Sequence, residues 1–225
     1  HTAITYGAAG GWFYREVTDA GSASSLLLTL LTAVDQAFFM GMFFLIAGYF
    51  TPASWRKKGS ARFMGERLLR LGVPLLVFGF VLGPLSAALA GAPAGQPVID
   101  RWLAMMAGAT FVIGPLWFAL ALLLFAAGWV ARAHLQTGAA GASASTSEAL
   151  PSWRAWLLAA LGVGAAALLI RQWVPVGTSV FGLQLGYFAS YLFLFALGCR
   201  AAAGRWLERV TAAQARGWGI VSIVT

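Results

Sequence analysis

The stretch DQAFFMGMFFLIAGYFTPASWRKKGSARFMGERLLRLGVPLLVF, from Asp35 to Phe78, decides the fold. It begins as an aromatic-rich apolar run, which we expect to be a helix that ends at Thr51 and Pro52. A basic connection over residues 51–70 follows, and a second apolar run begins at Leu71. One acid, Glu66, accompanies the six basic residues of the connection, which are Arg56, Lys57, Lys58, Arg62, Arg67 and Arg70. Two apolar runs on either side of such a charge cluster are typical of two membrane spans joined by a cytoplasmic loop.

The composition of the whole chain excludes a water-soluble domain. Of its 225 residues, 60% are hydrophobic and 10% are charged, whereas about a quarter of a soluble domain is charged. A net charge of +8 would suggest a nucleic-acid partner in a soluble protein, but loops enriched in Lys and Arg explain it better in a membrane protein. The single cysteine, Cys199, excludes an internal disulfide and indicates no metal cluster. We therefore expect a multi-pass protein of the lipid bilayer, with no metal and no nucleic acid.

Apolar runs long enough to cross a bilayer predict an all-α, polytopic transmembrane helix bundle. The five complete spans are expected at 26–50, from 71 to about 90, from 114 to near 132, at 153–173 and at 183–199. Partial spans are expected at both ends, so that residues 1–225 form one integral-membrane domain truncated at both ends. The small residues of 153–173 indicate a tightly packed interior helix. The Ala-, Gly-, Ser- and Thr-rich segment 136–152 indicates a flexible cytoplasmic linker.

Basic residues are distributed unevenly between alternate loops. If the loop 51–70 is cytoplasmic, its side of the membrane holds twelve of the fifteen Lys and Arg residues: six in that loop, two flanking the linker and four after Cys199. The opposite side holds three, which are Arg15, Arg101 and Arg171. The positive-inside rule therefore predicts that the loop 51–70 faces the cytoplasm, and we expect the bacterial inner membrane as the location.

Three polar residues at membrane depth are candidate site residues. His1 is expected about 10–14 Å below the outer exit of the first partial span, near the middle of a bilayer about 30 Å thick. An ionisable side chain at that depth indicates a functional site by default, although a hydrogen-bonded packing histidine is the alternative. Asp35 and Gln36 interrupt the span 26–50. They either form hydrogen bonds between helices or line a cavity for an acceptor substrate.

Two arginines at the mouth of the bundle are a candidate phosphate site. Arg67 and Arg70 are three residues apart, so they share a face if the segment is helical. Two guanidinium groups on one face can clamp phosphates, because each can hold two oxygens at once. The alternative is that both arginines are ordinary anchors on lipid headgroups. Their spacing alone leaves both interpretations open.

The sequence FFMGMFFLIAGYF, then the basic loop, then RLLRLGVPLL resembles the integral-membrane acyltransferase-3 family, which O-acylates sugars and other hydroxyl-bearing acceptors. That family carries an Arg-x-x-Arg motif in its first cytoplasmic loop, which Arg67-Leu68-Leu69-Arg70 matches directly before Leu-Gly-Val-Pro. Its first span carries a basic residue and, after ten residues, a histidine. His1 lies where that histidine is expected, and the basic partner would precede it. LWFALALLLF at 116–125 looks like the family's later LWFL segment.

The resemblance implies a membrane-bound O-acyltransferase that moves an acyl group from cytoplasmic acyl-CoA to a hydroxyl of a carbohydrate or another membrane or periplasmic acceptor. Arg67 and Arg70 would hold the donor's phosphates, His1 would be the general base, and Asp35 and Gln36 would line the acceptor site. Acyl-CoA would be a donor substrate, with no tightly bound cofactor. The alternative is a multi-pass transporter or permease for a saccharide or lipid-linked substrate, although no inverted repeat is visible. A structural membrane subunit would leave His1 unexplained.

Overall fold

The computed structural model describes residues 2–11, 15–16, 21–91, 97–137, 151–175 and 177–224. These residues form helices, turns and one isolated antiparallel bridge, between Val180 and Leu183. Five helical segments are long and apolar enough to cross a membrane: Ala23–Lys58, Ser60–Ala90, Gly114–Leu135, Trp153–Trp173 and Leu185–Gly204. The predicted all-α, polytopic bundle with five spans is therefore confirmed.

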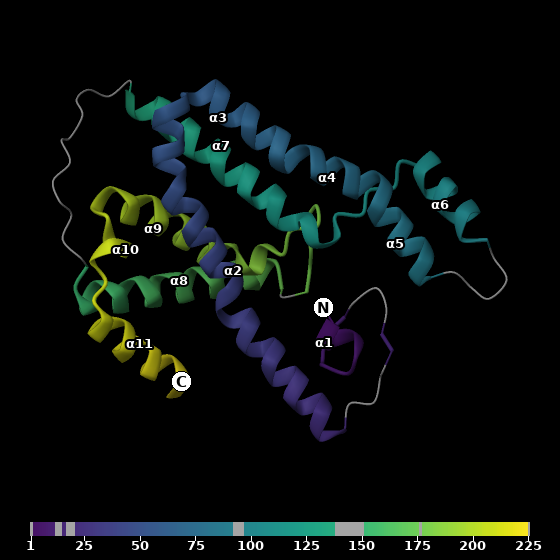
Figure 1. Cartoon of the computed structure of the whole chain (residues 1–225), viewed down its shortest axis with the longest axis horizontal. Coiled ribbons are helices and arrows are strands. Elements are labelled where there is room, and N and C mark those ends of the chain that lie inside the picture. The colour runs from purple at the N-terminus through teal and green to yellow at the C-terminus, as the bar shows by residue number, and fades with distance from the viewer. Residues whose placement is uncertain are drawn as a thin grey trace.

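The order of the helices along the chain can be followed in Figure 1. The helices are α1 (Thr2–Thr5), α2 (Ala23–Lys58), α3 (Ser60–Arg67), α4 (Val73–Val77), α5 (Gly83–Ala90), α6 (Val98–Ala107), α7 (Trp117–Thr137), α8 (Trp153–Trp173), α9 (Phe188–Gly204), α10 (Trp206–Arg209) and α11 (Ala212–Val224). Short 3₁₀ turns, Gly114–Leu116 and Leu185–Tyr187, precede α7 and α9. Residues 138–150 of the predicted linker lie outside the described residues.

The predicted end of the first complete span at Thr51 and Pro52 is wrong, because α2 continues through both residues to Lys58. Pro52 has no N–H to bond the preceding turn, but transmembrane helices tolerate proline where side chains and neighbouring helices satisfy the freed groups. The carbonyl that Pro52 leaves without its helical donor is that of Gly48. One residue earlier on each side, the buried Thr51 hydroxyl donates to the Ala47 carbonyl at 2.7 Å. The helix ends instead at Gly59, whose φ of 73° is a left-handed conformation that glycine adopts without strain.

The basic connection is also helical. From Ser60 to Ala90 the chain forms one helical element in which two π segments, Leu68–Gly72 and Phe78–Leu82, separate α3, α4 and α5. Pro74 and Pro84 each follow a π segment by two residues, and a proline has no N–H to donate to the preceding turn. In the second segment Gly83 N–H bonds to the Phe78 carbonyl in π register.

The core forms where α2, α7 and α9 meet. Phe44 of α2 has no exposed surface, and its ring stacks on Tyr191 of α9 at a centroid distance of 4.8 Å. Rings of α7 contact the same phenylalanine, with Phe118 at 4.8 Å and Phe125 at 5.2 Å. Such aromatic pairs stabilise beyond their buried area. The aromatic residues that made the stretch after Asp35 conspicuous therefore hold three spans together.

Helices α2 and α9 approach each other closely. A Cβ added at Gly48 would lie 2.1 Å from the Phe195 carbonyl oxygen, and one added at Gly198 would lie 2.1 Å from the Leu45 carbonyl oxygen. The two glycines thus face the backbone of the opposite helix from both sides of the crossing. Small residues at membrane interfaces allow this close backbone packing.

The prediction that the small-residue span is a tightly packed interior helix is wrong for the described part of the chain. α8 has no buried residue there, and a Cβ added at Gly162 or Gly164 would meet nothing within 4 Å. α8 packs along α9, and Trp156 contacts Trp206 of α10 at 6.3 Å between ring centroids. Small side chains permit close packing but do not impose it, since lipid satisfies an apolar helix equally well.

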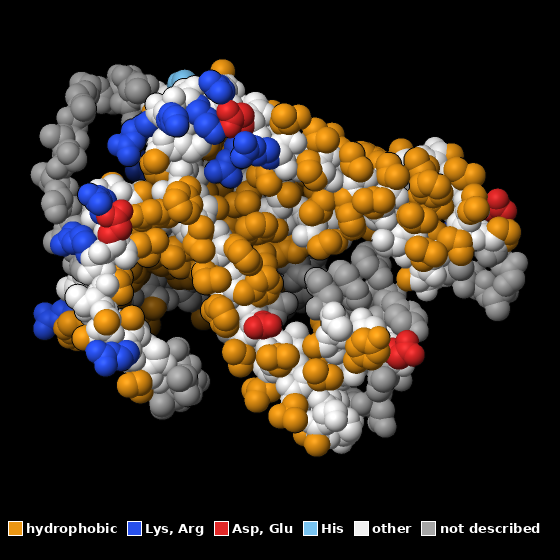
Figure 2. Space-filling model, viewed as in Figure 1, with side chains coloured by type: hydrophobic (Ala, Val, Ile, Leu, Met, Phe, Trp, Pro, Cys, Tyr) orange, Lys and Arg blue, Asp and Glu red, His pale blue; other side chains and the backbone are white. Residues whose placement is uncertain are grey.

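Hydrophobic side chains cover much of the visible face (Figure 2). Among them are long exposed residues on α2, such as Leu26, Leu30 and Phe38, each more than half exposed. A soluble monomer rarely exposes apolar patches of this extent. The surface is that of a protein solvated by lipid.

Candidate functional site

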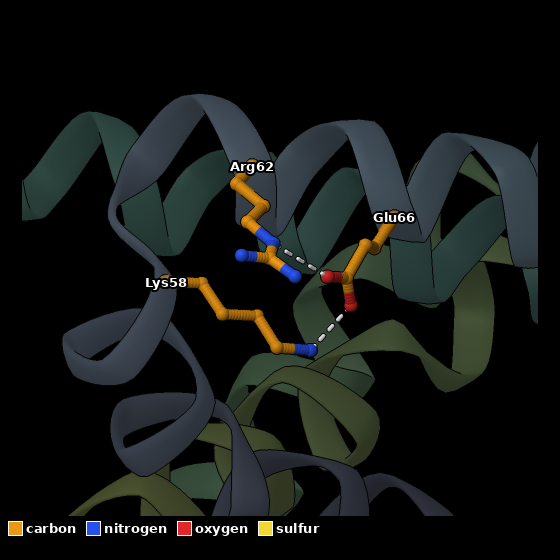
Figure 3. Close-up of polar contacts among 3 residues, drawn as sticks. All are labelled: Lys58, Arg62 and Glu66. Carbon is orange, nitrogen blue, oxygen red and sulfur yellow. Dashed lines mark hydrogen bonds and ion pairs between the residues drawn. The ribbon is translucent and has the colours of Figure 1, made fainter.

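The turn between α2 and α3 carries the largest group of charges in the basic stretch (Figure 2). Glu66 lies inside this group, and Lys58 and Arg62 both bind its carboxylate (Figure 3). Arg62 Nε donates to one oxygen at 3.2 Å, and Lys58 Nζ donates to the other. The only acid of the stretch is therefore already engaged by two of its six cations.

Arg67 and Arg70 form the remaining pair of interest. Arg67 is half-buried, with its guanidinium 5.3 Å from the ring centroid of Phe63, which is itself buried. Arg70 is exposed, and the two arginines are close enough for their charges to repel. Neither makes an ion pair with a carboxylate in the described part of the chain. Two like charges without a counter-ion favour the binding of an anion between them.

The backbone explains how these arginines are presented. Arg67 is the last residue of α3, and Arg70 lies in the first π segment, which precedes Pro74. A π turn within an α-helix is rare and occurs frequently at functional sites. The predicted helical segment is thus present, although its regular α geometry ends between the two arginines.

Of the three residues predicted at membrane depth, the structure describes the side chain of Asp35, and it does not bring Asp35 together with the arginines. Asp35 lies in α2 with an exposed side chain, and its carboxylate makes no ion pair within the described residues. Helix α2 runs from position 35 to Lys58 over about 35 Å of axis before the chain turns back into α3. Gln36 is in the same helix, but its side chain lies outside the described residues, as does His1. Their predicted roles stay predictions.

The structure contains a second basic site, which the sequence did not indicate. A cavity of about 560 Å³ lies between α7 and α9, and its lining includes Trp129, Arg132, Phe193, Leu197 and Arg200. Its volume is within the usual range for small-molecule sites. Arg132 and Arg200 appear in the sequence only as charges at the ends of two spans. These two arginines line the same cavity only because the two spans pack together, and no local sequence pattern indicates that packing.

Among the described residues no group of three His, Cys, Asp or Glu side chains is placed to hold a metal ion. The chemistry available in the described site is therefore anion binding by arginine.

Outside the spans, Glu208 accepts a hydrogen bond from Arg205 Nε at 2.7 Å, and this carboxylate raises the pKa of the Arg205 guanidinium.

Comparison with known families gives one match. Residues 8–225 match the family model described as an acyltransferase domain, which covers nearly the whole chain. No curated protein and no solved structure matches the chain.

Proposed function

The chain belongs to the acyltransferase-3 family, and from this premise we propose that it transfers an acyl group from cytoplasmic acyl-CoA to a hydroxyl of a carbohydrate or another membrane or periplasmic acceptor. The family and the apolar helix bundle make it a membrane acyltransferase. The donor, the acceptor class and the roles of individual residues are the content of the proposal.

The observation that carries the proposal is that Arg67 and Arg70 make no ion pair with a carboxylate in the part of the chain that the structure describes. Glu66 is occupied by Lys58 and Arg62, so these two guanidinium groups keep their capacity to hold an anion. Coenzyme A is rich in phosphate, and a guanidinium binds two phosphate oxygens at once. The pair therefore suits the phosphates of an acyl-CoA donor.

The distribution of charge supports entry of the donor from the cytoplasm. Basic side chains gather where α2 turns into α3 and again on α10 and α11 (Figure 2). The positive-inside rule assigns such an end to the cytoplasm, where acyl-CoA is found. The pantetheine arm of the donor would then extend along the bundle toward the middle of the membrane.

In the proposed reaction His1 is the general base. Its imidazole takes the proton of an acceptor hydroxyl while the hydroxyl oxygen attacks the thioester carbonyl carbon. A carbon–oxygen bond forms and the carbon–sulfur bond breaks. The His1 imidazolium then gives the proton to the departing sulfur, so that coenzyme A leaves as the thiol. Asp35 and Gln36, which share α2, would contact the acceptor.

The phosphate clamp is tested by donor kinetics with the full-length protein in membranes. In Arg67→Gln and Arg70→Gln we expect the KM for acyl-CoA to rise at least about tenfold, because each charge-assisted hydrogen bond contributes about 1.5–3 kcal/mol. The KM for the acceptor should not change. Arg56→Gln is the matched control, since Arg56 is an exposed cation at the same end. If neither arginine variant changes the donor KM, the clamp is refuted.

The general base is tested separately. Membranes with His1→Ala, matched to wild type in protein abundance by immunoblot, are expected to lose transfer from labelled acyl-CoA. Transfer at the wild-type rate would remove His1 from the chemistry. Membranes with wild-type protein that consume no acyl-CoA would refute the enzyme proposal and favour a transporter.

A further inference from the structure

We propose that α6 is an interfacial helix whose apolar flank, formed by Ile99, Leu103 and Met106, inserts among the lipids of the leaflet opposite the basic end of the bundle. Helix α6 belongs to the connection between the spans Ser60–Ala90 and Gly114–Leu135. It contains none of the residues assigned to the donor or the acceptor, so this surface is separate from the proposed chemistry.

Helix α6 is held beside the last turns of a membrane span. It packs on α5, and the Trp102 indole donates to the Val81 carbonyl at 3.0 Å. Val81 lies about 14 Å along the helix axis from Ala90, where the span ends. A second bond, from the Arg101 guanidinium to the Gly91 carbonyl, joins α6 to the end of the same span. Helix α6 therefore lies alongside α5, at the opposite end of the Ser60–Ala90 element from α3 (Figure 1).

The length of this span places its last turns in the interfacial region of the bilayer. The span Ser60–Ala90 has 31 residues, which form about 46 Å of helix, whereas the hydrocarbon core is about 30 Å thick. An ordinary tilt of about 20° does not remove the excess. Because the basic residues anchor the α3 end at one interface, the excess lies at the α5 end. Helix α6 therefore lies where acyl chains give way to headgroups, with lipid on one side and water on the other.

The surface that α6 turns away from α5 has two different flanks. One flank consists of large apolar side chains at helical spacing, which are Ile99 (65% exposed), Leu103 (52%) and Met106 (38%). The adjacent flank consists of one acid and two small side chains, which are Asp100, Ala104 and Ala107, all exposed. Residues three and four apart share a face of a helix. An apolar flank beside a polar, small-residue flank is typical of a helix that lies in the plane of the interface.

Lipid is favoured over a second copy of the chain as the occupant of the apolar flank. The neighbouring helix α5 exposes Leu82 (46%) and Leu89 (61%) within the membrane span, and Figure 2 shows hydrophobic side chains over the end of the molecule where α5 and α6 lie. The flank thus adjoins a surface that faces lipid. A stable interface between proteins buries about 800 Å² on each partner, which is more than three partly exposed side chains provide.

The test compares single-cysteine variants of the full-length protein in phosphatidylcholine liposomes, with the buried Cys199 replaced by serine. Leu103→Cys reports on the apolar flank, and Ala104→Cys, the next residue of the same helix, is the matched control on the other flank. With a membrane-impermeant maleimide we expect Leu103→Cys to react at least about tenfold more slowly, because the thiolate is the nucleophile and an apolar environment suppresses its formation. Bimane attached at Leu103→Cys should be quenched by nitroxide-labelled lipid more strongly than bimane at Ala104→Cys.

Equal reaction rates of Leu103→Cys and Ala104→Cys would overturn the proposal, because both flanks of α6 would then lie in the same medium. A slow reaction of Leu103→Cys without quenching by the labelled lipid would also overturn it, since protein would then cover the flank. Disulfide cross-linking of two Leu103→Cys chains would identify that protein as a second copy. Met106→Cys and Asp100→Cys are an independent pair on the same two flanks, and they keep the test valid if Leu103→Cys does not fold.

Discussion

Replacement of Gly198 by alanine is expected to destabilise the crossing of α2 and α9. The added Cβ would lie 2.1 Å from the Leu45 carbonyl oxygen and 2.8 Å from the Tyr49 backbone nitrogen. Ordinary contacts begin at about 3.4 Å, so the two backbones must move apart by more than 1 Å. No flexible side chain can absorb this shift, because both contacted atoms belong to the backbone.

The size of the effect follows from this overlap. Overpacking a close-packed interior costs about 1–3 kcal/mol, and for a chain of this length each kcal/mol lowers the Tm by about 2–4 °C. Gly198→Ala should therefore lower the Tm by about 2–12 °C. Gly48→Ala should behave alike, since its Cβ would lie 2.1 Å from the Phe195 carbonyl oxygen. The double variant should lose less than the sum of the two, because helices already separated by one methyl group accommodate the second at lower cost.

The assay is thermal unfolding of the detergent-purified protein, followed by size-exclusion chromatography with fluorescence detection. Gly162→Ala in α8 is the matched control, because it adds the same methyl group to a helical glycine of a membrane span with nothing within 4 Å. Alanine is the better helix former by about 1 kcal/mol, so this control should keep or raise the Tm. If Gly198→Ala and Gly162→Ala have the same Tm, the close approach of α2 and α9 is refuted.

Two further predictions concern contacts near the spans' ends. Glu66→Gln removes the negative charge that Lys58 and Arg62 share and leaves one acceptor oxygen. Because these side chains are partly or largely exposed, we expect the Tm to fall by no more than a few degrees; a Tm drop of more than about 5 °C would contradict this. Trp102→Phe removes the indole donor that bonds the Val81 carbonyl at 3.0 Å, at a cost of about 1 kcal/mol. It should lower the Tm by a few degrees relative to a surface control such as Leu103→Ala on the same helix, and an unchanged Tm would show that the bond does not contribute.

The spans were predictable from the sequence because bilayer thickness imposes a length and an apolar composition that local inspection detects. Trp153–Trp173 coincides with the predicted range, and the other four spans overlap theirs. The ends were less predictable. Pro52 suggested a helix end, but the helix continues because membrane helices tolerate a proline that a water-soluble helix does not. Gly59, with its positive φ, sets the real end.

The candidate site was predictable only where it is local in sequence. Arg67 and Arg70 are three residues apart, so their proximity follows from any helical geometry. Arg132 and Arg200 line the same cavity because α7 and α9 pack together, and this proximity cannot be inferred before the packing is known. α8 shows the converse: its small residues suggested interior packing, yet composition cannot distinguish a helix neighbour from lipid.

The two π segments between Ser60 and Ala90 bear on insertions and deletions. A π turn bonds residue i to i+5 where an α turn bonds i to i+4, so each segment holds one additional residue in the same ladder. The second is fixed by a tertiary bond, because the Gly79 carbonyl, which Pro84 cannot bond, accepts the Val112 N–H at 2.9 Å. The first π segment, Leu68–Gly72, likewise ends two residues before a proline, Pro74, and it contains Arg70. Alignments of related sequences should therefore place one-residue gaps between Arg67 and Pro74 rather than elsewhere in this helix, and a relative with such a gap would present its second arginine on a different side of the helix.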